Sequence, residues 1–348
     1  MAISYSEFMK AQPVERFHVE EPQEKGFLNK IFQRQSKDVD MSDERMERLK
    51  DMLRASKTGR QTLEFLEQKG AELIFEPMDY YGYFSPDENK VALNPAFSDE
   101  DCAVTFVHEV RHAWQDTQMI DNGLESTLNP TMTPKSFLVS GFFIEADACA
   151  SEVTYAHEMR EKNPKIWEAH QKSPYAPMST EFEKTFKETG DVAQAREAAL
   201  LKWFDLRVKK SYEDTYVEYM SEVANELRKE KEMEPQYFAE DRSTKTMIDL
   251  MGKDYDGNKF FTKTKALEAE DKLFLTEKGT KDLAKALAGY MVKYNRTSSD
   301  LGLDKITVVD EKGNKSTMKD AVEDVRLRGR YAKENQPILA ALASQRSR

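Results

Sequence analysis

The sequence predicts an α+β protein that is mostly helical, and three features of the chain support this fold class. Residues 98–118 place apolar side chains among polar ones with no Gly or Pro, which indicates a long helix with one buried side. Three short segments of strand character precede that helix, between residues 72 and 93. Most of the chain beyond residue 135 again has helical patterning, apart from one hairpin pattern near residue 310.

The first patterned part of the chain is expected to be a helix pair followed by a small sheet. A charged helix is predicted over Met41–Ser56, and Thr58 is the expected N-cap of a second helix, Gly59–Lys69, which Gly70 ends. A turn at residues 85–89 separates the last two of three predicted strands, which are Glu72–Glu76, Tyr80–Phe84 and Lys90–Leu93.

Helices account for most of the remaining prediction. A polar loop at residues 121–134 separates the 98–118 helix from a second long helix, Lys135–Lys162, which Pro164 ends or restarts. A β-hairpin is predicted from Ile306–Val309 and Lys315–Met318, which flank a Gly-containing turn. Further helices are expected at Asp191–Val208, Tyr212–Glu232, Ser243–Gly252, Thr280–Tyr294, Lys319–Arg328 and Gln336–Ser344.

The segment His108-Glu109-Val110-Arg111-His112 carries the strongest chemical signal in the chain. Residues four apart share one helix face, so His108 and His112 can offer two ring nitrogens to one metal ion. Glu109 can reach a water on that ion and act as general base. Zinc favours such nitrogen ligands and often keeps a position open for water. The segment therefore predicts a zinc site in which Glu109 is the catalytic residue.

A third protein ligand is typical of catalytic zinc, and we expect Glu145 to provide it. It lies on the next predicted helix among apolar neighbours, where a buried carboxylate needs a partner. The alternative partner for Glu145 is a salt bridge to Arg111. Asp147 is the rival third ligand, or it holds one histidine by that ring's second nitrogen. Glu152 shares a face with Glu145 and is a weaker candidate for such a supporting role.

Several other polar residues have two interpretations. Tyr212, Tyr216 and Tyr219 could steady a developing oxyanion, but aromatic core packing is the favoured interpretation. Arg111 either orients an acidic neighbour or is a surface charge. His170 is isolated in the sequence, and we expect it to be an ordinary surface or core residue.

With these residues identified, the chain resembles a bacterial group of zinc metallopeptidases. The resemblance rests on His-Glu-Val-Arg-His-Ala-Trp-Gln at residues 108–115 and Glu-Ala-Asp-Ala at residues 145–148, and it covers about residues 55–220. The chain resembles gluzincins more distantly, and this implies a zincin-like core with His108, His112 and Glu145 on Zn²⁺ and Glu109 as base. One departure is Cys149, because thermolysin-like patterns have Asp four residues after the ligand Glu.

The order of elements also suits a zincin: a helix, a small sheet, the His-Glu-x-x-His helix and a Glu-bearing helix. We therefore predict an N-terminal arm (residues 1–40), a zincin-like metallopeptidase domain (41–224), and a mostly helical C-terminal extension with a short hairpin (225–348). The predicted function is hydrolysis of peptide bonds through a metal-activated water. Two alternatives are a non-catalytic interaction protein on a zincin fold and a zinc hydrolase that acts on a non-peptide amide.

Composition narrows the partners and the compartment. The net charge of −11 opposes nucleic-acid binding, which usually requires a basic surface. No apolar run is long enough for a membrane span, and the N-terminus lacks a standard secretory signal, so we expect a cytoplasmic protein unless another export route is used. The two cysteines form no disulfide framework, which suits a reducing compartment. The expected partner is a peptide or protein substrate, with a further protein partner possible through the arm or the C-terminal helices.

Overall fold

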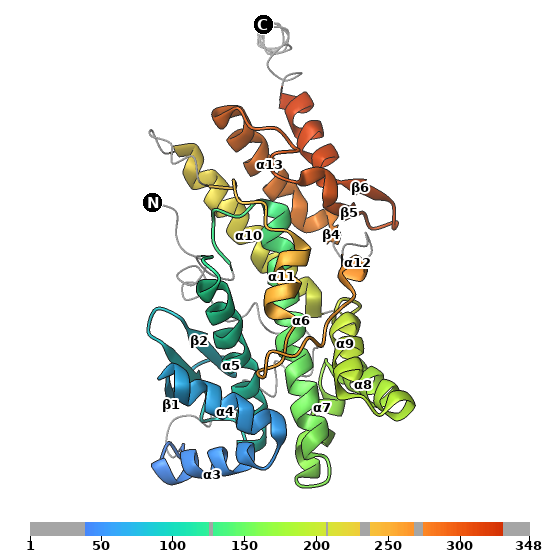
Figure 1. Cartoon of the computed structure of the whole chain (residues 1–348). Helices are drawn as coiled ribbons and strands as arrows, with labels where there is room; N and C mark the ends of the chain where they lie inside the picture. The colour runs from blue at the N-terminus through green and yellow to red at the C-terminus, as the bar shows by residue number, and fades with distance from the viewer. Residues whose placement is uncertain (1–38, 125–127, 207, 230–236, 268–273, 330–348) are drawn as a thin grey trace, which may run out of the picture.

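The computed structural model describes residues 39–124, 128–206, 208–229, 237–267 and 274–329 (Figure 1). Within these ranges the chain is mostly helical, with two small mixed sheets, and this confirms the predicted α+β class. The predicted helix at 336–344 and nearly all of the predicted N-terminal arm lie outside the described residues.

Two short helices, α3 (Asp43–Arg54) and α4 (Lys57–Lys69), open the described chain. The prediction that Thr58 caps α4 is wrong, since the Ser56 hydroxyl accepts from the Gly59 N–H at 2.8 Å instead. The backbone N–H of Thr58 and its hydroxyl both donate to the carboxylate of Glu158 on a later helix. Gly70 ends α4 as expected, in the left-handed conformation that favours glycine.

The first sheet has the strand order β1-β3-β2, with bounds Glu72–Phe75, Gly82–Ser85 and Lys90–Leu93 for β1, β2 and β3. The central strand β3 is parallel to β1 and antiparallel to β2. Strand β2 begins two residues later than predicted because the Asn94 side-chain amide holds the carbonyls of Met78 and Tyr80. A Cβ on Gly82 would lie 2.7 Å from the Thr105 side chain, so β2 runs directly against the helix that follows the sheet.

Helix α5 (Asp99–Asp121) and helix α6 (Pro134–Met159) pack against each other beside this sheet (Figure 1). Ser98 caps α5 by accepting from the Asp101 N–H, which agrees with the acidic helix start predicted there. Helix α6 runs through the middle of the molecule and is buried on nearly all sides, which explains its apolar composition.

Three further helices cover one side of α6 near its C-terminal end (Figure 1). Their bounds are Pro164–Lys172 (α7), Ala176–Thr189 (α8) and Val192–Trp203 (α9). Pro164 restarts the helix, as the sequence allowed, because proline suits the first position of a helix. Asp191 caps α9 by accepting from the N–H groups of Ala193 and Gln194.

The C-terminal part continues the helical pattern around a second small sheet. Helix α13 packs against α10, and the strand order is β4-β5-β6. The predicted hairpin is confirmed as the antiparallel pair β5 and β6, whereas β4, which pairs parallel to β5, was not predicted. The helical prediction near residue 320 is confirmed, with helix over residues 318–329. The remaining bounds are Val208–Lys229 (α10), Thr244–Met251 (α11), Thr264–Leu267 (α12), Phe274–Thr276 (β4), Glu277–Tyr294 (α13), Leu303–Lys305 (η2), Thr307–Val309 (β5) and Lys315–Thr317 (β6).

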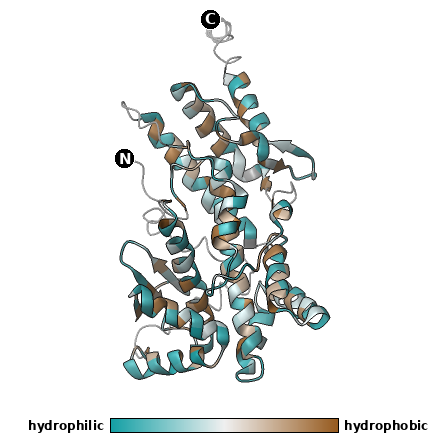
Figure 2. Ribbon diagram, in the orientation of Figure 1, coloured by the Kyte–Doolittle hydropathy of each residue, from teal (hydrophilic) through white to brown (hydrophobic). Residues whose placement is uncertain are grey.

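Two apolar clusters form the core, and apolar side chains gather where helices face one another (Figure 2). The smaller cluster joins α3, α4, the first sheet and α5 to the end of α6. The larger cluster includes residues on both sides of position 224. None of the described helices is long and apolar enough to cross a membrane.

Candidate metal centre

Three side chains from α5 and α6 converge on one point. The Nε2 atoms of His108 and His112 are 2.9 Å apart, and Glu145 Oε2 lies 3.6 Å from the first and 3.7 Å from the second. The two histidines are brought together by their i, i+4 spacing on α5, and the carboxylate by the packing of α6. This spacing of ligand atoms could hold one metal ion.

The outer nitrogens of both rings are held by acceptors. His108 Nδ1 lies 2.5 Å from Glu152 Oε1, and His112 Nδ1 lies 2.9 Å from Gln115 Oε1. The Gln115 amide is oriented because its nitrogen donates to Ile144 O and Asp147 Oδ2, so its oxygen faces His112. Each ring therefore carries its proton on Nδ1 and presents a lone pair at Nε2.

With this tautomer the convergence point holds acceptors alone, and either a protonated ring or a bound cation would supply the missing positive charge. Glu145 Oε2 is buried and makes no hydrogen bond among the described residues. Two imidazole lone pairs and a carboxylate oxygen so close together require a positive charge between them. Two nitrogens and one oxygen are a donor set that suits zinc with a fourth position left open.

The pKa shifts of the converging side chains also favour a positive charge at the site. Burial acts to raise the pKa of Glu145, but the charges of His112 and His108 outweigh it and hold that pKa well below its usual range. Burial acts to lower the pKa of His112, but the Glu145 carboxylate outweighs it, and the net pKa is raised. The site therefore attracts a cation, and a metal would compete there with protons.

Glu109 follows the first histidine on α5 and is partly exposed. Burial raises the pKa of its carboxyl, against the opposing charges of His108 and His112. A carboxylate with a raised pKa is a better proton acceptor near neutral pH.

Asp147 lies away from the three converging atoms, at the centre of a buried polar network. Its carboxylate accepts from Arg111 Nε at 2.6 Å, from a terminal nitrogen of Arg196 at 2.7 Å and from the Gln115 amide at 2.8 Å. Asp147 therefore touches neither histidine and reaches His112 only through Gln115.

Arg111 is fully buried, with its guanidinium over the Trp114 ring. It also donates to the carbonyls of Met251 and Lys253, which ties α5 to the end of α11 and the residues that follow it. The surface-charge interpretation of Arg111 is therefore wrong, and its ionic partner is Asp147 rather than Glu145.

Sequence reasoning underrated Glu152 and missed His170. Glu152 holds His108, and His170 Nε2 lies 3.6 Å from Glu152 Oε2, while His170 Nδ1 lies 2.7 Å from the Ser179 hydroxyl. His170 is therefore a buried residue, in agreement with the core interpretation, but it also lies beside the site. Spacing could have favoured Glu152, because seven residues are close to two helical turns from Glu145. No sequence signal connects His170, on α7, to this site.

The tyrosines divide into two groups. Tyr216 and Tyr219 are buried in the aromatic core beside Phe137, as the favoured interpretation predicted. Tyr212 forms the second group together with Tyr175. Burial raises the pKa of both, and the negative charge of Glu145 acts in the same direction.

The fold and the site together define a helical α+β protein with a histidine–carboxylate centre between two packed helices. A family model described as "Putative metallopeptidase family (DUF6782)" matches residues 28–249, and the chain belongs to this family. No curated protein and no solved structure matches the chain. Family membership confirms the predicted metallopeptidase resemblance and implies a metal cofactor.

Proposed function

We propose that this protein is a zinc-dependent peptidase in which His108, His112 and Glu145 hold the metal. One observation carries the proposal: three buried or partly buried acceptor atoms face one another, and the second nitrogen of each ring is already engaged by Glu152 or Gln115. The inward-facing Nε2 atoms and the Glu145 carboxylate are thereby left to bind a cation.

The chemistry divides between the metal and the protein. Zinc, when bound, would polarise the scissile carbonyl and a water molecule. Glu109 is the base that accepts the proton of the attacking water and then passes it to the leaving amine, so one proton moves and none is lost. Glu152 and Gln115 keep both rings in the tautomer that directs Nε2 inward.

The sheet offers a place for an extended substrate. Strand β2 is an edge strand that pairs only with β3 among the described residues, and it lies against α5 at Thr105, one turn before His108. An extended peptide can add to such an edge through backbone hydrogen bonds. We infer that α5, α6 and this sheet form a zincin-like core with a peptide or protein substrate along β2.

Glu109→Gln tests the base. The variant should bind zinc as the wild type does but cleave a peptide library at least about 100-fold more slowly, since a positioned general base typically contributes this much. Zinc is measured by mass spectrometry after purification without chelator. Glu161→Gln, at an exposed position in the turn just after α6, is the control and should leave cleavage unchanged. If Glu109→Gln cleaved the peptides as fast as the wild type, Glu109 would not be the general base.

Glu145→Ala and Asp147→Ala test the ligand assignment. Glu145→Ala should lose most of the bound zinc, because one of three protein ligands is removed. Asp147→Ala should lose less, since Asp147 reaches the site only through Gln115. The reverse order would transfer the ligand role to Asp147.

A further inference from the structure

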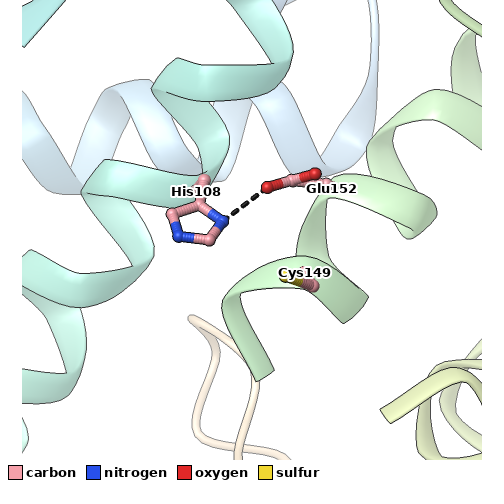
Figure 3. Close-up of side chains that lie close together, drawn as sticks. All are labelled: His108, Cys149 and Glu152. Atoms are coloured by element: carbon pink, nitrogen blue, oxygen red, sulfur yellow. Dashed lines mark hydrogen bonds and ion pairs between the residues drawn. The ribbon is translucent and has the colours of Figure 1, made fainter. Parts of the chain in front are cut away.

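A second group of metal-binding side chains adjoins the first and shares His108 with it. His108, Cys149 and Glu152 place ring nitrogen, thiol sulfur and carboxylate oxygen within 4.8 Å of one another. Figure 3 shows the Glu152 carboxylate joined to the His108 ring, with Cys149 one turn earlier on the same helix. Cys149 and Glu152 are three residues apart, so they lie on one face of α6.

The two groups use opposite sides of the His108 ring. Nε2 faces His112 and Glu145, whereas Nδ1 faces Glu152. One imidazole ring thus lies between two donor sets, and each nitrogen can serve a different cation.

An unpartnered histidine nitrogen borders the second group. His170 Nε2 is buried, makes no hydrogen bond among the described residues and lies 3.6 Å from Glu152 Oε2. The ring is fixed by the hydrogen bond between its Nδ1 and Ser179. Burial of a free ring nitrogen is costly, and a ligand beside Glu152 would offset that cost.

We propose that His108, Cys149 and Glu152 form a second site, selective for thiophilic divalent cations such as Cd²⁺ or excess Zn²⁺. Sulfur and nitrogen ligands favour these ions over Mg²⁺ or Ca²⁺, which prefer oxygen. Binding releases the Cys149 thiol proton to solvent, while the His108 proton moves from Nδ1 to Nε2, so the ring stays neutral and no electron is transferred.

Occupation of the second site also affects the first. A cation on Nδ1 replaces the hydrogen bond from His108 to Glu152 that directs Nε2 inward. Excess thiophilic metal should therefore weaken the first site. This consequence rests on the proposed function, whereas binding at the second site does not.

Cadmium titration of the metal-free, full-length protein tests the second site. The probe is the ultraviolet thiolate-to-cadmium charge-transfer absorption, with stoichiometry from calorimetry. The wild type and Cys102→Ser should both show this absorption. Cys149→Ser should lose the absorption and should bind one cation fewer per chain than the wild type. Cys102 is the matched control because it is equally buried and its thiol lies instead beside Asn94 O. Circular dichroism establishes that both variants are folded.

Glu145→Ala separates the two proposals. This variant should lose the first cation but retain the charge-transfer absorption, because Glu145 is no part of the second site. Absence of the absorption from the wild type, its persistence in Cys149→Ser, or its loss in Glu145→Ala would each overturn the second site. Failure of Cys149→Ser to bind any cation would instead count against the proposed peptidase centre alone, because this variant lacks the second site and keeps His108, His112 and Glu145.

Discussion

Glu152 Oε1 lies 2.5 Å from His108 Nδ1, while Glu145, on the same face of α6, lies 3.6 Å from the Nε2 atom of the same ring. One helix face thus contacts both nitrogens of one histidine. Because α6 is buried along its length, neither carboxylate can move far without disturbing the core. The relationship makes His108 the most constrained residue of the site.

Glu152→Gln should weaken zinc binding about 10- to 100-fold, the usual effect of losing a carboxylate that supports a metal-bound histidine. The amide can still accept from Nδ1, so the fold should persist while the charge is lost. Competition with a fluorescent zinc chelator measures the affinity. Glu161→Gln, whose side chain is 82% exposed, is the control. Equal affinity in both variants would show that Glu152 does not support His108.

Asp147→Ala should destabilise the metal-free protein by about 3–5 kcal/mol, because it leaves two buried guanidinium groups without their counter-ion. Arg111 is fully buried and the Arg196 side chain is 8% exposed, so solvent cannot replace the carboxylate. Urea unfolding in the presence of chelator measures the loss. Glu188→Ala, at an exposed position on α8, should change little. An Asp147→Ala variant as stable as that control would contradict the network.

His157 should make the protein less stable as the pH falls from about 6.5 to about 4. Burial, and then the charge of Arg160, lowers the pKa of His157 from 6.5 to about 4, and its ring packs among Trp167, Phe182 and Phe186. Above pH 6.5 the His157 ring is neutral in both the folded and the unfolded chain, so it adds nothing to the pH dependence of stability. Below pH 6.5 the unfolded chain binds the proton before the folded chain does. The resulting loss of folding stability approaches about 3 kcal/mol at most.

His157→Phe measures this effect, because phenylalanine keeps the aromatic packing and cannot titrate. The melting temperature of the variant should fall less than that of the wild type between pH 6.5 and pH 4. A constant difference between the two proteins across this range would mean that His157 does not titrate as the structure requires.

Gly141→Ala should destabilise the contact between α6 and α10 by about 1–3 kcal/mol, as expected of overpacking. A Cβ at this position would lie 2.6 Å from the ring of Tyr216, whose hydroxyl donates to the Gly141 carbonyl. Thermal unfolding measures the loss. Gly329→Ala is a matched helical control with nothing within 4 Å, and it should stabilise by about 1 kcal/mol or less. A similar change in melting temperature in the two variants would show that the Tyr216 ring moves aside at little cost.

The regular spacing of residues inside each helix accounts for what sequence reasoning predicted well. The i, i+4 histidines, the long helix that carries them and the next long helix with Glu145 follow from local periodicity. The zinc ligand role of Glu145 remains a prediction, and so do the domain boundaries.

The roles of the neighbouring acids were harder to predict. Asp147 lies only two residues from Glu145, which is about 200° around the helix, and it therefore faces α9 and Arg111. Glu152 lies two turns on and faces His108. Helical geometry alone could have ranked Glu152 above Asp147 as the residue that holds a histidine.

The sequence by itself determined which residues share a helix face, because backbone hydrogen bonding sets that periodicity locally. Tertiary structure alone decided which face meets which, and so brought His170 to Glu152, Arg196 to Asp147 and Cys149 to His108. These contacts depend on how α5, α6, α7 and α9 rotate and pack against one another. That rotation is set by the fit of side chains across the whole core, which no local pattern encodes.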